Sequence, residues 1–335
     1  MLQLGSFLAL AVIGTGIVWV GSDLLEGAAD RLAVYYGLPL IVQGALLAAI
    51  GSSMPELMTA ILAPLVHGEF ELGVSVIIGS AIFNILVIPA LATLSTPDGL
   101  SATRELVYKE AQFYLIAVSV FLLVLSLAVI YEPTDDMGIT GELTPLLALL
   151  PIALYALYIF LQYLDMTEHV PTRDPAGIRP IREWARFLGG FVLILIGVEG
   201  LLRAAIGIGD TLGTPSFLWG LTVVAVATSL PDAFVSIRAA ERDRSVTSIA
   251  NVFGSNVFDL LVAVPAGVLV VGGTLINFGR LAPLIGVLVV ATIALFTTLR
   301  TNFALSRREA WFLLLVYGAF LVWVLLESVS TFGVP

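Results

Sequence analysis

Long apolar segments recur from one end of the chain to the other, separated by short polar connections. Windows of about 20 apolar residues are long enough for an α-helix to cross a bilayer. The alternating pattern typical of outer-membrane β-strands is absent. We therefore expect an all-α polytopic membrane protein. Ten transmembrane helices are predicted, near residues 3–20, 37–64, 71–95, 110–131, 143–164, 185–206, 214–239, 246–271, 277–299 and 309–328.

Composition supports this class of protein. The 335 residues are 59% hydrophobic and only 12% charged, more apolar than any soluble domain requires. The chain has no cysteine, which excludes a disulfide framework, a thiolate metal site and a thiol nucleophile. Acidic residues outnumber basic ones by 25 to 15. We expect the lipid bilayer as a partner, and neither a nucleic acid, a cofactor nor an enzymatic activity.

The basic residues predict an orientation. If both termini lie outside, the cytoplasmic connections hold most of the lysine and arginine residues, and only Arg203 and Arg280 remain for the outer side. This bias follows the positive-inside rule and indicates a multi-pass protein of the cell membrane. The basic residues on the predicted cytoplasmic side are Arg31, Arg104, Lys109, Arg173, Arg179, Arg182, Arg186, Arg238, Arg242, Arg244, Arg300, Arg307 and Arg308.

The chain also repeats itself. Gly37, Pro39, Gly44, Ser53 and Pro55 match Gly213, Pro215, Gly220, Ser229 and Pro231, all at an offset of 176 residues. We expect a first five-helix repeat over 1–164, a cytoplasmic linker over 165–184 and a second five-helix repeat over 185–335. Because five is odd, the second repeat crosses the membrane in the opposite sense. Inverted repeats of this kind are typical of secondary transporters.

The strongest repeated pattern is polar. Residues 51–56 read Gly-Ser-Ser-Met-Pro-Glu, and residues 227–232 read Ala-Thr-Ser-Leu-Pro-Asp. Residues 79–84 read Gly-Ser-Ala-Ile-Phe-Asn, and residues 254–259 read Gly-Ser-Asn-Val-Phe-Asp. Ionisable side chains inside membrane segments are costly and indicate an ion or proton path.

The spacing directs these polar groups to common helix faces. Residues three or four apart share a face, as do Ser52 and Ser53 with Glu56, Ser80 with Asn84, and Ser255 with Asp259. Pro55 and Pro231 lack an N–H, so each is expected to bend its helix and free backbone carbonyls at the membrane midplane. Irregular backbone at that depth is tolerated only where it lines a cavity.

Together these groups predict a cage made of oxygen atoms: three carboxylates, one carboxamide, hydroxyls and freed carbonyls. Oxygen ligands without imidazole or thiolate suit Ca²⁺ or Na⁺ and disfavour zinc or copper. Two close carboxylates repel each other when no ion is bound, so one tends to take up a proton or a monovalent ion. That repulsion gives a physical basis for exchanging one divalent ion against several monovalent ones.

The four segments resemble the two α-repeats of the cation/Ca²⁺ antiporter superfamily, and especially its sodium/calcium exchangers. The motifs span 49–84 and 225–259. The resemblance implies a monomeric secondary-active antiporter that extrudes Ca²⁺ against entering Na⁺ by alternating access, with its first and sixth helices sliding across the others. It implies Glu56 and Asp232 as central Ca²⁺ ligands, flanked by Asn84 and Asp259. It assigns Ser53, Ser80, Ser229 and Ser255 to Na⁺ sites, and main-chain oxygens to Ala49, Ser52, Ala225 and Thr228.

Two departures bear on the coupling ion. Asp232 is shorter than the glutamate that many prokaryotic relatives carry, which changes its reach to the ion. The string His67-Gly68-Glu69, together with Asp259, resembles the potassium-dependent branch, so coupling to K⁺ stays open. A H⁺/Ca²⁺ antiporter is a further alternative, although such relatives usually have a motif poor in hydroxyl groups.

Two alternative functions, an intramembrane protease and a calcium channel, have weaker support in the sequence. Gly207-Ile208-Gly209-Asp210 matches a string of intramembrane aspartyl proteases, but it falls in a connection expected outside the membrane, with no Tyr-Asp partner. A calcium channel is disfavoured because inverted repeats around a midplane site are typical of carriers. The sequence therefore favours an antiporter.

Overall fold

The structure is a computed structural model that describes residues 2–37, 49–134, 139–164 and 177–332. Almost all of this part of the chain is helical, which confirms the predicted all-α membrane fold. The first half contains the elements α1 (Leu2–Tyr35), α2 (Ala49–Ser52), α3 (Met54–His67), α4 (Phe70–Ser95), β1 (Leu100–Ser101), the π-helical η2 (Leu106–Glu110), α5 (Ala111–Tyr131), β2 (Thr140–Leu143) and α6 (Pro145–Leu164).

The second half follows the same order. Its elements are α7 (Pro180–Leu212), α8 (Ser216–Trp219), the π-helical η3 (Gly220–Val224), α9 (Ala225–Glu241), α10 (Ser245–Phe258), the π-helical η4 (Asp259–Ala263), α11 (Val264–Val271), β3 (Thr274–Asn277), α12 (Phe278–Arg300), β4 (Ala304–Leu305) and α13 (Arg307–Phe332).

In the described residues, nine helices are long and apolar enough to cross a membrane. A shorter apolar helix, α3, lies where the second predicted span ends, while residues 38–48 of that span lie outside the described residues. The sixth helix is longer than predicted, because Pro180 starts it and polar residues such as Arg182 and Glu183 extend its first turns. Residues 165–176 of the predicted linker also lie outside the described residues.

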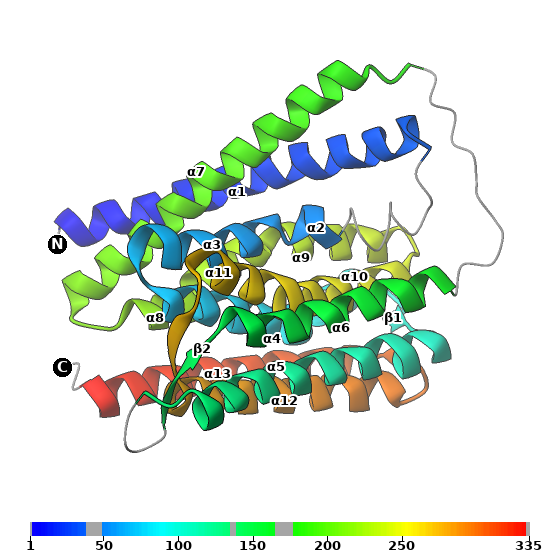
Figure 1. The fold of residues 1–335 in the computed structure, drawn as a ribbon. Helices are drawn as coiled ribbons and strands as arrows, with labels where there is room; N and C mark the ends of the chain where they lie inside the picture. The colour runs from blue at the N-terminus through cyan, green and yellow to red at the C-terminus, as the bar shows by residue number, and fades with distance from the viewer. Residues whose placement is uncertain (1, 38–48, 135–138, 165–176, 333–335) are drawn as a thin grey trace.

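Two short antiparallel ribbons, which the sequence did not predict, link the two repeats. Strand β1 pairs with β4, and β2 pairs with β3. Strands β1 and β3 follow corresponding helices of the two repeats, as do β2 and β4. Each ribbon therefore pairs a strand that follows α4 or α11 with a strand that follows α12 or α5 of the other repeat. The ribbons lie at opposite ends of the bundle (Figure 1), as inverted repeats require.

The helices form a bundle with one separate pair. Helix α4 is almost wholly buried and packs against α3, α9, α10, α12 and α13. Helices α1 and α7 run antiparallel along one side of this bundle, and α1 also contacts α2 and α9 (Figure 1). The start of α1 and the end of α13 lie at the same end of the molecule. Two of the four motif segments, 51–56 and 227–232, therefore lie on helices that α1 contacts directly.

Glycines allow α1 and α7 to pack closely. A Cβ atom at Gly21 would lie 2.9 Å from the carbonyl oxygen of Gly190, and one at Gly14 would lie 3.0 Å from that of Gly197. Gly14 and Gly190 are repeat equivalents, as are Gly21 and Gly197, so the crossing obeys the pseudo-symmetry. Close backbone approach at small residues is a common mode of helix association in membranes. An ion pair between Arg31 and Glu183 (2.6 Å) adds a second link between the two helices.

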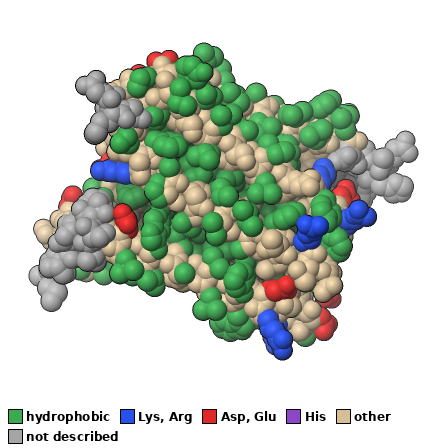
Figure 2. Space-filling view, turned by 90° about the horizontal axis from the view of Figure 1, so that it is seen from below, with side chains coloured by type: hydrophobic (Ala, Val, Ile, Leu, Met, Phe, Trp, Pro, Cys, Tyr) green, Lys and Arg blue, Asp and Glu red, His purple; other side chains and the backbone are tan. Residues whose placement is uncertain are grey.

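The surface is that of a membrane protein. Apolar side chains cover the middle of the face in Figure 2, and charged side chains gather at its two ends, with arginine and lysine mainly at one of them. Large apolar side chains are also exposed on several helices of the described chain, among them Val12, Leu146, Leu315 and Leu325. In water such a surface would promote aggregation, whereas in lipid it is the expected solvent-facing composition.

Candidate cation-binding site

The structure brings the predicted polar residues together in the interior of the bundle. We call this group the oxygen cage. All of its side chains are buried, with at most 2% of their surface exposed. Its members are Ser52, Ser53, Glu56, Ser80, Asn84, Thr228, Ser229, Asp232, Ser255 and Asp259.

Glu56 is positioned by a break in its helix. Helix α2 ends at Ser52 and α3 begins at Met54, with Ser53 between them at φ −90° and ψ 11°. Pro55 lies in the first turn of α3, where its missing N–H is harmless. The proline thus starts a new helix instead of bending a continuous one. The break places Glu56 in the first turn of α3, where the helix dipole favours a negative charge.

The second repeat is distorted at other residues. Helix α9 runs through Pro231 without interruption, and the irregular backbone lies before it, in the π-helical segment η3. Asp259 begins another π-helical segment, η4. Such segments are frequent at functional sites. The two repeats therefore reach similar polar positions through different backbone geometry.

The hydrogen bonds around the two central carboxylates are equivalent. Glu56 Oε1 accepts a hydrogen bond from Ser80 Oγ at 3.2 Å, and Asp232 Oδ1 accepts one from Ser255 Oγ at 3.2 Å. In both of these bonds the serine and the carboxylate come from the same repeat. Ser229 Oγ of the other repeat also donates to Glu56 Oε1, at 3.5 Å. The inverted symmetry thus extends to the side chains of the cage.

Serine pairs join the two repeats across the cage. Ser80 Oγ lies 2.7 Å from Ser229 Oγ, and Ser52 Oγ lies 3.2 Å from Ser255 Oγ. Strict symmetry would pair Ser255 with Ser53, the equivalent of Ser229. The contact goes to Ser52 instead, because the helix break falls at Ser53.

The two flanking residues differ. Asn84 Nδ2 donates to Asp232 Oδ2 at 3.5 Å and to Asn256 Oδ1 at 3.0 Å. Asp259 occupies the equivalent position but has no hydrogen to donate when ionised. Among the described residues its two buried oxygens accept no close hydrogen bond, although the hydroxyl of Ser53 lies near enough to interact with them. Glu56 and Asp232 lie near enough for their charges to act on Asp259. One side of the cage is therefore more negative than the other.

Among the described residues, several oxygens of the cage form no hydrogen bond. A buried acceptor without a partner is costly, and a bound cation would offset that cost for several such oxygens together. In the described part of the chain, no three His, Cys, Asp or Glu side chains are grouped so as to hold a metal ion. A bound cation would therefore draw on hydroxyl and amide oxygens as well. The unpartnered oxygens are Ser53 Oγ, Glu56 Oε2, Asn84 Oδ1, Asp259 Oδ1 and Asp259 Oδ2.

The main-chain carbonyl oxygens predicted as ligands lie in different surroundings. Thr228 Oγ1 donates to the carbonyl oxygen of Ala225 at 3.2 Å, so that carbonyl already has a donor. Ser52 and Ala49 lie in the short helix α2, and the side chain of Ala49 is outside the described residues. The proposed carbonyl ligands therefore remain predictions.

Asn256, which was not predicted from the sequence, also belongs to the polar network. Its Nδ2 donates to the carbonyl oxygen of Ala81 at 3.2 Å and to Tyr114 Oη at 3.4 Å, while its Oδ1 accepts from Asn84. Asn256 thereby orients the amide of Asn84. Ala81 is its repeat equivalent, and a polar residue in only one copy of the motif was the signal that could have identified it.

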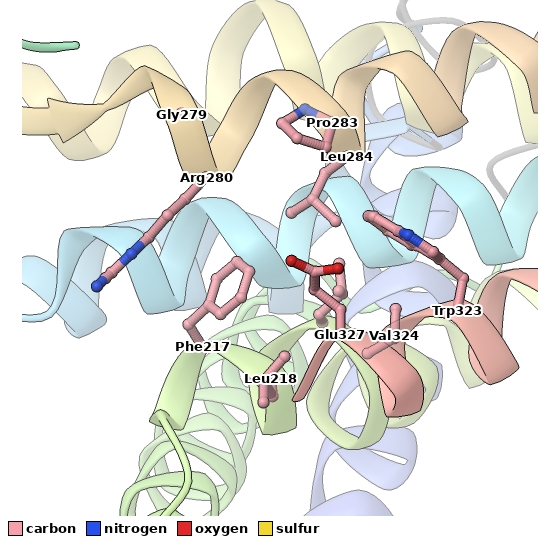
Figure 3. A pocket seen from close by; sticks show the side chains of 10 residues that line it. Phe217, Leu218, Gly279, Arg280, Pro283, Leu284, Trp323, Val324 and Glu327 are labelled. Atoms are coloured by element: carbon pink, nitrogen blue, oxygen red, sulfur yellow. The ribbon is translucent and has the colours of Figure 1, made fainter. Parts of the chain in front are cut away.

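Other candidate groups lie away from the cage. Asp210, of the protease-like string, is exposed near the end of α7, which corrects its expected place in a connection. A pocket of about 240 Å³ lies between α8, α12 and α13 and has mostly apolar walls. Figure 3 shows the carboxylate of Glu327 between Phe217 and Leu284 in this pocket. None of its lining residues belongs to the cage.

This chain is similar to known cation exchangers in sequence and in fold. The chain is 23% identical over 346 residues to the sodium/calcium exchanger MaX1 of Methanosarcina acetivorans, covering 95% of this chain and 97% of that one. Its fold is similar to the solved sodium-calcium exchanger NCX_Mj (TM-score 0.61, 22% identity, 94% and 97% covered). It is also similar to the H⁺/Ca²⁺ exchanger CAX (TM-score 0.73, 17% identity, 96% and 81% covered).

A family model extends this likeness over most of the chain. The model described as sodium/calcium exchanger protein matches residues 6–164 and 183–326. These two ranges include both α-repeat motifs and nearly all of the helices. The chain therefore belongs to the sodium/calcium exchanger protein family.

Proposed function

We propose that this protein is a secondary-active antiporter that exchanges Na⁺ for Ca²⁺ at the oxygen cage. The observation that carries the proposal is a buried cluster of carboxylate, amide and hydroxyl oxygens, in which Glu56 Oε2, Asn84 Oδ1 and both oxygens of Asp259 accept no close hydrogen bond from the described residues. Carboxylate, amide and hydroxyl oxygens are the ligands that Ca²⁺ takes in proteins. Glu56 and Asp232 would bind Ca²⁺ centrally, with Asn84 and Asp259 beside them.

The hydroxyl groups support Na⁺ as the coupling ion. Ser80 and Ser229 bring neutral oxygens next to Glu56, and Ser52 and Ser255 do so near Asp232. A proton carrier needs only the carboxylate, whereas Na⁺ needs several oxygens around it. Ca²⁺ and Na⁺ would compete, because they would share the carboxylates. The H⁺-coupled and K⁺-dependent alternatives are outcomes of the experiment below.

Alternating access would come from the pair formed by α1 and α7. The two helices lie on one side of the cage helices and are joined by the glycine crossing and by the ion pair of Arg31 with Glu183. We expect them to move together, exposing the cage to one side at a time. We also propose that the protein acts as a monomer in the cell membrane. Both termini would lie outside, an orientation that is supported by the arginines at one end of the molecule.

The proposal is tested by ⁴⁵Ca²⁺ uptake into proteoliposomes that contain the purified full-length protein. Vesicles loaded with Na⁺ and diluted into Na⁺-free medium should take up Ca²⁺ rapidly, while vesicles loaded with K⁺ or choline should not. Adding K⁺ outside tests whether K⁺ is carried along with Ca²⁺. Uptake that ignores the Na⁺ gradient and follows an imposed pH gradient would replace Na⁺ with H⁺ as the coupling ion.

A further inference from the structure

Helix α1 carries a polar pair that the cage does not include. Ser22 and Glu26 are four residues apart, so they share one face of α1. Ser22 is fully buried, and neither Ser22 Oγ nor Glu26 Oε1 has a hydrogen-bond partner in the part of the chain that the structure describes. The spacing of hydroxyl and carboxylate is that of Ser52 with Glu56 and of Ser255 with Asp259.

This face of α1 lies against the cage helices. A Cβ atom placed on Gly51 would lie 3.0 Å from Glu26 Cγ, so the glutamate packs directly on α2, next to Ser52. Asp232 is near enough for its charge to act on Glu26. Trp19 of α1 also stacks on Phe234 of α9, with ring centroids 4.2 Å apart. Helix α1 thus contacts α2 at Glu26 and α9 at Trp19, seven residues earlier.

The second repeat has no such pair. At an offset of 176, Ser22 corresponds to Val198 and Glu26 to Leu202, and both are fully buried in an apolar cluster. That cluster also contains Met54 from α3 and Val224 from η3. The α7 side of the cage is therefore sealed by apolar packing, whereas the α1 side offers a hydroxyl and a carboxylate.

Neighbouring positive charges do not explain why the carboxylate of Glu26 is packed inside the protein. Arg31, the nearest arginine along α1, forms its ion pair with Glu183. Asp23 and Asp30 are exposed acidic residues of the same helix and add negative charge. Burying a carboxylate oxygen without a donor costs free energy that an apolar side chain packed on Gly51 would not incur. A cation that visits this position offsets that cost.

We propose that Ser22 and Glu26 form a second cation subsite beside Asp232, through which Ca²⁺ passes between the cage and the side of the membrane that carries Arg31. This inference rests on the proposed cage and adds a step to it. Two protein groups leave most of the coordination of Ca²⁺ to water, so the subsite would hold a partly hydrated ion. Because the α7 side lacks the pair, the subsite serves entry from one side only.

The test is ⁴⁵Ca²⁺/Ca²⁺ self-exchange in proteoliposomes, which needs neither a Na⁺ nor a H⁺ gradient. Since the protein has no cysteine, a single cysteine at exposed Ser101 (Ser101→Cys) and an impermeant maleimide report which side faces out. For Glu26→Gln we expect the KM for Ca²⁺ to rise about tenfold on the Arg31 side, because a unit charge close to a divalent ion is removed. On the opposite side the KM should stay within about twofold.

Control variants separate a subsite from a general loss of charge. Asp23→Asn removes an exposed carboxylate from the same helix and should leave both KM values near those of the wild type. Glu26→Asp should restore part of the lost affinity, and Ser22→Ala should raise the KM on the Arg31 side only. A Glu26→Gln protein with unchanged KM values, or with equal increases on both sides, would overturn the subsite. Wild-type uptake that ignores Na⁺ would instead overturn the proposed coupling ion and leave the subsite standing.

Discussion

Replacing Glu56 by glutamine changes one charge at the centre of the oxygen cage while preserving shape. Oε1 of Glu56 accepts hydrogen bonds from Ser80 and Ser229, and Oε2 is buried with no donor among the residues that the structure describes. The amide introduced by Glu56→Gln can retain one of these contacts through its carbonyl oxygen. Its NH₂ group, however, would point a donor at the place where a cation binds. The fold should therefore survive while the ion site is lost.

The magnitude follows from the charge and the ligand distance. A carboxylate oxygen about 2.4 Å from Ca²⁺ contributes roughly 14 kcal/mol of attraction at an effective dielectric constant of about 20. Dehydration of the ion and of the carboxylate offsets most of this attraction. After this offset we expect the loss of the Glu56 charge to weaken the binding free energy of Ca²⁺ by about 4 kcal/mol, which corresponds to about a thousandfold weaker Ca²⁺ binding.

The assay is equilibrium ⁴⁵Ca²⁺ binding to the purified protein in detergent. Glu105→Gln is the matched control, because Glu105 is an exposed glutamate outside the cage. Gel filtration and the thermal unfolding midpoint should be unchanged in both variants. If Glu56→Gln bound Ca²⁺ within about tenfold of the wild type, Glu56 would not be a direct ligand and the reasoning above would be refuted.

Two further predictions test the cage and the α1–α7 crossing. Ser80→Ala removes a hydrogen bond to a charged group and should lower the apparent Na⁺ affinity about tenfold in transport assays. The control Ser126→Ala, away from the cage, should leave the Na⁺ affinity unchanged. Equal effects of the two variants would argue against a role of Ser80 in Na⁺ binding. Gly21→Ala should destabilise the protein by about 1–3 kcal/mol in denaturant unfolding, because its methyl group meets Gly190. Gly16→Ala, in open space, should be neutral or stabilising; destabilisation there would contradict the packing argument.

Much of the architecture could be predicted because bilayer spans and repeats are local or periodic signals. Hydropathy located the membrane helices, and an offset of 176 residues identified which of them correspond. The helix ends were harder to predict, since hydropathy fades where Arg182 and Glu183 continue α7 beyond the apolar window. The paired strands were missed because two to four residues carry no recognisable pattern.

The cage residues were predictable in kind but not in arrangement. Glu56 and Asp232 stood out as carboxylates in apolar segments, yet no sequence rule shows that Pro55 starts a helix while Pro231 lies inside one. Glu26 was overlooked because it lies between Asp23 and Asp30, and acidic residues after an apolar span usually mark the membrane interface. Only packing against Gly51 reveals that it reaches the cage helices.

The central claim is that one cage binds either Ca²⁺ or Na⁺. It is tested most directly by ⁴⁵Ca²⁺ binding to the wild-type protein at increasing Na⁺ concentrations, with choline keeping the ionic strength constant. We predict that Na⁺ raises the apparent Kd for Ca²⁺ steeply without changing the number of sites, because both ions use Glu56 and Asp232. A Kd that does not respond to Na⁺, or a fall in the number of sites at constant Kd, would contradict a shared cage.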